Sequence, residues 1–314
     1  MNKWLTALIV ILVLYLVGAS VALFVFKSDN GLGDKIVIVP VTGAIGTSSE
    51  GDLFNSGGVS STTLVRDIKD LAKDSSVRGV IFEIDSPGGT AVASQEVADA
   101  IKELNKPNYA VIRDVGASGA YWIATATDKI IASPISITGS IGVIASYLDF
   151  SNLFDKYGVT YERLVAGDKK DIGSPYKQLT PEERIILQKK LDIIHEFFVH
   201  EVATNRNLSV DYVRNLSTGE FFLGQEAKDL GLIDVLGNRD TAIELMKIEL
   251  NNTNLDVVEK EPAGGLINAL IGRSSYAFGR GFAKELITVD TQNKLEINAW
   301  FYKNSEGFSK NFSK

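Results

Sequence analysis

A regular alternation of short apolar segments with amphipathic segments restricts the fold of this chain more than any other feature. Runs rich in valine and isoleucine, typical of buried strands, lie at 35–41, 80–84, 109–113 and 129–132. Segments with apolar residues at helical spacing lie between them, at 62–73, 91–104 and 118–127. Strands that alternate with helices through short connections predict an α/β fold with a largely parallel sheet covered by helices.

The alternation continues in the second half of the chain. Further segments with a strand or helix pattern lie at 141–147, 150–157 and 159–164. A long helix is predicted from Thr180 to about Asn205, because a proline and two glutamates occupy its first turn. We expect a short extended piece, a two-turn helix capped by Gly231 and a helix over 240–249 to follow. The length of 314 residues allows one large domain or two small ones.

The amino-terminal segment contains a long uncharged apolar run. No charged residue lies between Trp4 and Phe26, and a helix of this length reaches about 35 Å, which spans a bilayer with some tilt. The alternative is a cleaved signal peptide with Ser20-Val-Ala22 as its cleavage site, but the apolar run continues past that site. The sequence therefore predicts a transmembrane anchor over 1–27, a linker over 28–34, a folded domain over 35–260 and a C-terminal tail over 261–314, which forms an amphipathic helix or an oligomer contact.

Composition excludes several classes of function. The net charge of −7 argues against a nucleic-acid partner. The absence of cysteine excludes disulfides, thiolate zinc sites and thiol catalysis. The only histidines, His195 and His200, lie five residues apart on a predicted helix and therefore about 140° apart around its axis, so they cannot bind one metal from one face. We predict neither a metal site nor a cofactor.

One serine stands between small residues at a predicted junction of strand and helix. Ser118 lies in the sequence Gly116-Ala-Ser-Gly-Ala120, where its hydroxyl group is uncrowded and open to a cleft. The positive end of the helix dipole at this point favours a developing oxyanion. Serine is also a favoured N-cap residue, and the stretch taken alone fits an ordinary N-cap better than a nucleophile.

Two other loops carry candidate site residues, although each loop can also be explained without a function. Asp85-Ser-Pro-Gly-Gly89 joins a strand to a helix, and the N–H groups of Gly88 and Gly89 are free to point into a cleft, although such a turn is also explained by its backbone requirements. Lys169 and Lys170 lie together in a loop, where lysines are usually solvated.

A serine nucleophile needs a base, and both histidines lie on a packing helix. A lysine can serve as the base once burial and nearby dipoles lower its pKa, so that the neutral amine is populated. A serine–lysine pair requires neither metal nor cysteine. The residues alone therefore leave a serine–lysine dyad and a Ser-His-Asp triad as alternatives, and a triad would require a histidine to reach the cleft.

Five motifs occur in a fixed order along the chain. They are Asp85-Ser-Pro-Gly-Gly89, Ala117-Ser-Gly-Ala-Tyr121, Thr138-Gly-Ser-Ile-Gly-Val143, Lys169-Lys-Asp-Ile-Gly-Ser-Pro175, and Phe222-Leu-Gly-Gln-Glu-Ala227 with Gly231-Leu-Ile-Asp234. This set, together with the amino-terminal run, resembles the signal peptide peptidase A family, the S49 serine peptidases of the ClpP/crotonase-like fold. The resemblance covers roughly residues 35 to 250.

The resemblance implies a role for each candidate residue. Ser118 resembles the nucleophile of the family and Lys170 its general base, while Lys169 is the less favoured lysine. Gly88 and Gly89 resemble the backbone contacts to the oxyanion and to the substrate strand, and Gly119 contributes its own N–H group. The segment 138–143 resembles one wall of the cleft.

The same resemblance implies a serine endopeptidase held in the cell membrane by a single span, with an extracytoplasmic catalytic domain. Its expected partners are the membrane, remnant signal peptides and other unfolded or apolar peptides. Further copies of the chain are also expected partners, in a ring- or dome-like homo-oligomer whose catalytic groups approach from neighbouring subunits. The alternatives are a catalytically silent scaffold of the same fold that binds extended peptides, and a crotonase-like acyl-CoA enzyme.

Overall fold

The computed structural model describes residues 33–48 and 58–260. The predicted anchor over 1–27, most of the predicted linker and the predicted tail over 261–314 lie outside these residues. Within the described ranges, none of the helices combines the length and the apolar character that a membrane span requires.

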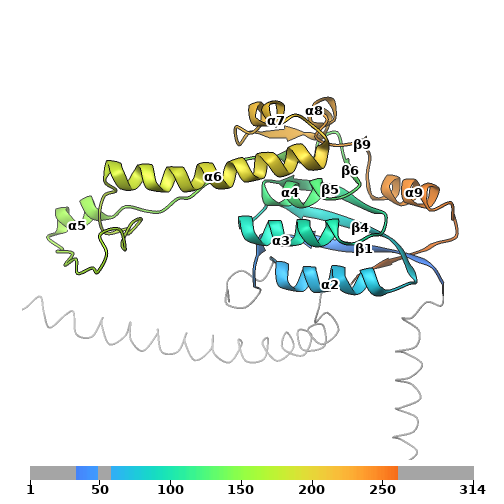
Figure 1. Ribbon diagram of the computed structural model, residues 1–314, viewed down its shortest axis with the longest axis horizontal. Helices are drawn as coiled ribbons and strands as arrows, with labels where there is room; N and C mark the ends of the chain where they lie inside the picture. Colours follow the sequence, from blue (N-terminus) through green and yellow to red (C-terminus); the bar gives the residue numbers. More distant parts are fainter. Residues whose placement is uncertain (1–32, 49–57, 261–314) are drawn as a thin grey trace, which may run out of the picture. The chain divides into compact units, whose positions relative to one another are not determined.

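The described residues form an eight-stranded sheet that is largely parallel (Figure 1). The main strands are, in spatial order, β10 (Asp256–Glu259), β1 (Lys35–Thr42), β4 (Val77–Ser86), β5 (Asn108–Ala117), β6 (Lys129–Ala132) and β9 (Val235–Leu236). All pairs in this series are parallel. The end of β5 also pairs with β7 (Ile137–Gly139), on which β8 (Phe221–Leu223) lies antiparallel. The predicted largely parallel α/β sheet is therefore confirmed.

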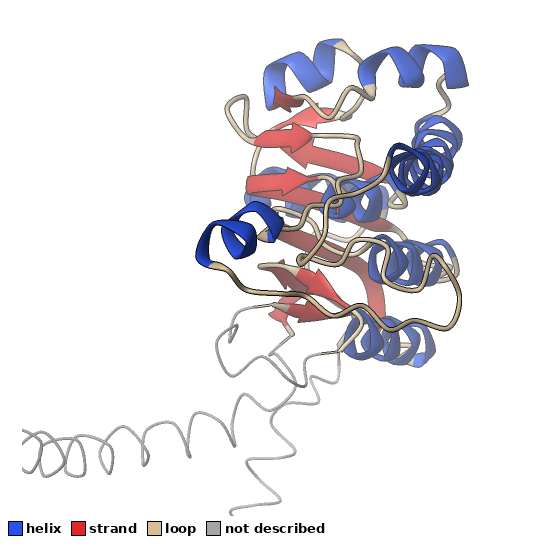
Figure 2. Cartoon of the chain, turned by 90° about the vertical axis from the view of Figure 1, so that its left-hand side faces the viewer, coloured by secondary structure: helices blue, strands red, loops and turns tan. Residues whose placement is uncertain are grey.

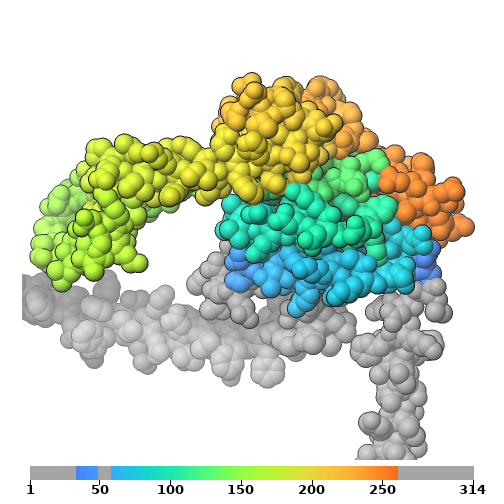
Figure 3. Space-filling view, in the orientation of Figure 1, coloured from blue at the N-terminus to red at the C-terminus, as the bar shows by residue number. Residues whose placement is uncertain are grey.

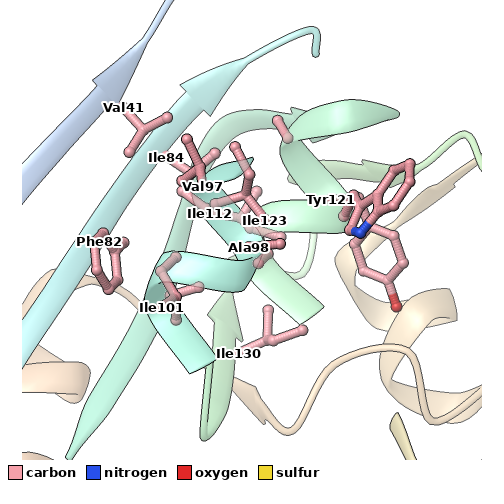
Figure 4. Packing of buried hydrophobic residues seen from close by; sticks show 14 of the residues in the cluster. Val41, Phe82, Ile84, Val97, Ala98, Ile101, Ile112, Tyr121, Ile123 and Ile130 are labelled. Atoms are coloured by element: carbon pink, nitrogen blue, oxygen red, sulfur yellow. The ribbon is translucent and has the colours of Figure 1, made fainter. Parts of the chain in front are cut away.

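The central strands are apolar on both faces because helices cover both. Along β1, Val37 and Val39 belong to one core cluster whereas Ile36 and Ile38 belong to the other, as the two-residue period of a strand requires. The larger cluster also contains Phe82 from β4, which is fully buried (Figure 4). This explains why these strands could be predicted as continuous apolar runs.

Helices pack on the two faces of the sheet. One face carries α2 (Ser61–Lys73), α3 (Ala91–Lys102) and α4 (Gly119–Thr125), which the larger cluster joins to the strands (Figure 2). On the other face α9 (Arg239–Glu249) buries Ala242 and Met246 against β1, β4 and β5. The predicted helices over 62–73, 91–104, 118–127 and 240–249 are thus confirmed, with small shifts at their ends.

The longest helix, α6 (Pro181–Arg206), begins with a capping box in which Thr180 and Glu183 bond each other's backbone N–H groups. Its C-terminal half packs on α4, where Phe198 stacks on Trp122 with ring centroids 4.8 Å apart. Its N-terminal half extends beyond the layers of sheet and helices together with α5 (Ser151–Tyr157) (Figures 1 and 3). We call residues 143–195, which include α5 and this half of α6, the arm.

Two predicted elements are wrong. The segments 141–147 and 159–164 form neither strand nor helix, and most of their residues are exposed. Their apolar pattern resembles that of an element, but the described chain offers them no sheet to pair with. The prediction over 150–157 corresponds to α5, and the two-turn helix before Gly231 corresponds to α8 (Gly224–Asp229). No sequence pattern predicted α7 (Val210–Leu216) or the short strands β2 (Ile45–Gly46), β3 (Val59–Ser60), β7, β9 and β10.

Candidate active site

Two turns from strand to helix meet at the carboxyl edge of the sheet. One joins β4 to α3 and carries Gly88 and Gly89, and the other joins β5 to α4 and carries Ser118 and Gly119. The turns are neighbours because β4 and β5 are adjacent parallel strands, with Ser86 in register with Gly116. In parallel sheets the carboxyl edge is where ligand sites form. The structure thus brings four of the five predicted site residues together.

The turns lie so close that side chains are excluded between them. A Cβ on Gly88 would lie 2.8 Å from the amide nitrogen of Gly119 and 3.0 Å from Cβ of Ser118. Gly88 also has φ of +100°, which favours glycine. A Cβ on Gly89 would lie 1.9 Å from the carbonyl oxygen of Ile45, to which the turn is bridged. The glycines are therefore required by both conformation and space.

Ser118 has an uncommon backbone conformation. It occupies the N-cap position of α4 with φ of 54° and ψ of −124°, a region that residues other than glycine rarely adopt. Its N–H donates to the carbonyl oxygen of Gly139 at 2.8 Å, and its own carbonyl oxygen accepts from the N–H of Trp122 at 3.0 Å. Its side chain makes no capping hydrogen bond. The plain N-cap explanation therefore fails, and a strained turn that presents a hydroxyl group is typical of a nucleophile.

The N–H groups of the two turns are not equivalent. The N–H of Gly88 donates to Oγ of Ser86 at 3.1 Å, and this hydroxyl donates in turn to the carbonyl oxygen of Gly43 at 2.6 Å. Within residues 33–48 and 58–260, neither Gly89 nor Gly119 donates its N–H to a backbone or side-chain acceptor. These two N–H groups are therefore the ones available to an oxyanion.

The segment over 138–143 borders the serine turn on the side away from β4. The side chain of Thr138 donates to the carbonyl oxygen of Gly116 at 2.9 Å, and Ser140 donates its N–H to the carbonyl oxygen of Glu220 at 3.0 Å. In the antiparallel pair β7–β8, Gly139 lies opposite Phe221. The segment is thus held from both sides next to Ser118.

The two candidate lysines differ in their surroundings. Lys169 pairs with Glu182 in the first turn of α6, with Nζ 2.7 Å from Oε2. The side chain of Lys170 is exposed and forms no hydrogen bond or ion pair with any part of the chain that the structure describes. Of the two side chains, that of Lys169 is therefore paired, whereas that of Lys170 has no partner among the described residues.

A single chain does not bring Lys170 to Ser118. The loop between α5 and α6, which carries Lys170, lies beside the N-terminal end of α6 (Figure 1), where Lys169 pairs with Glu182. The helix that starts after Ser118 packs on the other half of α6. Glu182, the partner of Lys169, and Phe198, the partner of Trp122, are 16 residues apart on α6 (182 to 198), which is about 24 Å along the helix axis.

The histidines do not complete a triad. Both lie on α6, where His200 is largely exposed and Nε2 of His195 is buried without a hydrogen-bond partner among the described residues. Neither forms a hydrogen bond with Ser118, whose side chain has no partner in the described structure.

Two further residues shape the site, of which Gly139 was expected only as part of the cleft wall over 138–143 and Ile45 was not predicted at all. Gly139 holds the N–H of Ser118 through its carbonyl oxygen, and Ile45 forms a bridge with Gly89 from the two-residue strand β2 (Ile45–Gly46). Gly139 lies in one of the quoted motifs, so its position gave a signal. Ile45 gave none, because a two-residue strand next to a Gly/Ser-rich stretch has no periodicity.

Comparisons with known proteins identify the family. Residues 100–253 match peptidase family S49. The chain is 32% identical over 293 residues to a protein of Methanocaldococcus jannaschii named as a protease, covering 90% of this chain and 94% of that one. It is 34% identical to a protein of Enterococcus faecium named as a signal peptide peptidase (78% and 72% covered). It is 31% identical to the chloroplastic serine protease SPPA of Arabidopsis thaliana (85% and 41% covered). The chain therefore belongs to peptidase family S49, the family of signal peptide peptidase A, and is a serine-type peptidase.

Proposed function

We propose that this peptidase is a membrane-anchored endopeptidase of the ClpP/crotonase-like fold that cleaves peptides with a dyad of Ser118 and Lys170. The observation that carries the proposal is the strained turn at Ser118, next to the N–H groups of Gly89 and Gly119, which have no acceptor among the described residues. Lys170 is the proposed base because its amine has no partner among the described residues whereas Lys169 is paired with Glu182.

The proposed reaction follows from these positions. The hydroxyl oxygen of Ser118 attacks the carbonyl carbon of the scissile bond while its proton passes to the neutral amine of Lys170. The N–H groups of Gly89 and Gly119 donate to the oxyanion that forms. Gly88, whose N–H donates to Ser86 and whose carbonyl oxygen accepts from Ile45, holds the turn in place instead. The protonated lysine then gives its proton to the leaving amine. Water, activated by the same lysine, hydrolyses the acyl-enzyme and frees Ser118.

The base is proposed to come from a neighbouring copy of the chain, in a ring- or dome-like homo-oligomer. This origin of the base is supported by the distance along α6 that separates Ser118 from the loop of Lys169 and Lys170, which we call the lysine loop. So does the surface of the arm, on which Ile144 and Leu148 are exposed and Leu164 is 95% exposed. Large apolar side chains gathered on a projecting segment are typical of a surface that a partner covers.

The proposed substrates are remnant signal peptides and other unfolded or apolar peptides. The resemblance to signal peptide peptidase A supports this class, and the apolar run over 4–26 would place the catalytic domain beside the membrane that holds such peptides. We propose a single span with an extracytoplasmic catalytic domain. The tail over 261–314 would add a contact to the membrane or to another copy.

The test is the rate at which the full chain, in detergent, cleaves casein and a synthetic signal peptide. Ser118→Ala and Lys170→Ala are expected to abolish cleavage, whereas Lys169→Ala, a matched control in the same loop, retains it. The wild-type rate rises toward basic pH, because only a neutral amine accepts the proton. Normal cleavage by Lys170→Ala would show that another residue acts as the base. Peptide binding without any cleavage by the wild type would favour the silent scaffold.

A further inference from the structure

The arm is mostly exposed, yet one of its carboxylates is buried and another is largely shielded from solvent. Every residue from Ala145 to Asp149 and from Asp155 to Lys170 is exposed. Against this background the side chain of Asp171 is 11% exposed and that of Glu183 is 3% exposed. Carboxylates are rarely buried unless cations pair with them, so their burial calls for an explanation in this part of the chain.

Asp171, the residue next to the proposed base, is held by two cations from other segments. Arg163 donates to its two carboxylate oxygens from Nε at 2.6 Å and from Nη2 at 2.9 Å, which is the forked pairing that only arginine provides. Nζ of Lys177 lies 3.5 Å from Oδ1 of the same carboxylate. The hydrogen bonds from Arg163 lower the pKa of Asp171, so the carboxylate stays charged.

The same cations tie the loop to α6. Lys177 also donates to Glu183 at 2.6 Å, and Glu183 closes the capping box at the start of the helix. Arg163 in turn donates to the carbonyl oxygen of Asp168 at 3.0 Å. Arg163, Asp171, Lys177 and Glu183 thus form one chain of charges, which we call the arm network. It joins the segment after α5, the lysine loop and the first turn of α6.

Within this frame the loop backbone is folded into consecutive turns. Lys170 donates its N–H to the carbonyl oxygen of Gly167 at 3.0 Å, and Ser174 donates to that of Asp171 at 3.0 Å. Tyr176 packs beside them between Phe154 and Tyr161, with ring centroids 5.7 and 5.4 Å away. Hydrogen bonds before and after Lys170 therefore hold its backbone in place. Its side chain is exposed and points to no partner among the described residues, so it can extend away from the arm.

We propose that Arg163 and Asp171 are positioning residues that hold the loop so that Lys170 enters the site of a neighbouring copy. This rests on the proposed role of Lys170 as the base. A base must approach the nucleophile within hydrogen-bond reach, and a displacement of about 1 Å reduces a rate about 100-fold. A rigid loop on a projecting arm is what delivery of a base to another chain requires.

The test compares Asp171→Asn, Arg163→Ala and Lys169→Ala with the wild type, using the full-length chain and the cleavage assay above. Asp171→Asn and Arg163→Ala are expected to lower kcat about 10- to 100-fold with KM nearly unchanged. Lys169→Ala, whose partner is Glu182 outside the arm network, retains activity. Guanidinium at low millimolar concentration restores part of the activity of Arg163→Ala, because it can occupy the space of the lost side chain beside Asp171, whereas sodium at equal ionic strength does not.

Three results would overturn the proposal. They are wild-type kcat in both variants, a fall in activity accompanied by a lower midpoint of thermal unfolding or loss of assembly, and an absence of guanidinium rescue. Lys170→Ala in the same assay separates this inference from the proposed function. If Lys170→Ala is inactive but Asp171→Asn is normal, only the positioning role fails. If Lys170→Ala is active, the dyad itself fails.

Discussion

The backbone N–H of Ser118 donates to the carbonyl oxygen of Gly139 over 2.8 Å, which joins the serine turn to β7. Gly139 accepts this bond with φ of +72°, in a position where a Cβ would lie 2.7 Å from the ring of Phe222. The serine is thus fixed by the edge of its own sheet. One chain therefore brings Ser118 together with the proposed N–H donors, and it carries the proposed base on the arm.

Gly119→Ala is expected to lower kcat about 10- to 100-fold, since displacing an oxyanion donor has effects of this order or larger. The new Cβ would lie 2.2 Å from Oγ of Ser94 and 3.2 Å from the amide nitrogen of Gly89, so the two turns would separate. Adding Ser94→Ala removes the closest contact, and the double variant should recover part of the loss. Equal activity of the single and double variants would show that this contact does not set the geometry.

Ser118→Gly is expected to be inactive but more stable than Ser118→Ala, by about 1 kcal/mol in the free energy of unfolding. The reason is the backbone conformation at φ of 54° and ψ of −124°, which costs free energy for any residue with a Cβ. Urea unfolding of the two inactive variants measures the difference. If Ser118→Ala is the more stable of the two, the turn is not strained.

Leu164→Asp is expected to weaken self-association and to lower activity in parallel, without lowering the midpoint of thermal unfolding of the single chain. The side chain of Leu164 is 95% exposed on the arm, so its apolar surface contributes only when another copy covers it. Ile248→Asp on α9 serves as the control, since Ile248 is also largely exposed but lies outside the arm. Sedimentation velocity measures association. Equal effects of both variants would argue against an interface at Leu164.

The pair of Asp234 and Arg206 predicts a pH dependence of stability. Burial opposes the charged form of Asp234, but hydrogen bonds from Arg206 at 2.7 and 2.9 Å and from the N–H of Ile130 at 2.7 Å outweigh it and lower its pKa. A lowered pKa of a carboxyl group stabilises the fold above its unfolded value of about 4, and this contribution is lost as the pH falls through the folded value.

Asp234→Asn should therefore lower the free energy of unfolding near neutral pH, and the difference from the wild type should shrink as the pH falls below about 4. Urea titrations at several pH values between neutrality and about 3 measure this difference. A difference that stays constant over this range would mean that Asp234 acts through packing rather than through its charge.

The core of the fold could be predicted because its strands are buried on both faces. The runs that became β1 and β4 are apolar at nearly every position, and α3 and α4 follow glycine-rich turns directly. The segments 141–147 and 159–164 carry a similar apolar pattern, but most of their residues stay exposed in one chain. An apolar pattern indicates that residues are suited to burial, but it does not indicate whether their own chain or another copy of it buries them. This is the physical reason for the wrong predictions over these two segments.

The candidate site could be predicted in part, for a different reason. Ser118, Gly88 and Gly89 lie in short motifs next to strands, and parallel neighbouring strands bring such turns together. The pairing of Lys169 with Glu182, and the network that holds Asp171, depend on how the loop packs on α6. No local pattern encodes that packing, so the sequence could rank the lysines only through the family resemblance.

The most direct test of the central claim, a dyad formed by Ser118 of one copy and Lys170 of another, is complementation between two inactive variants. Ser118→Ala and Lys170→Ala chains are dissociated, mixed in equal amounts and reassembled, and cleavage of a signal peptide is measured. A dyad between copies restores about one quarter of the wild-type sites, because each site draws its serine and its lysine from two independently chosen chains. A mixture as inactive as its components, although mixed oligomers have formed, would contradict the account.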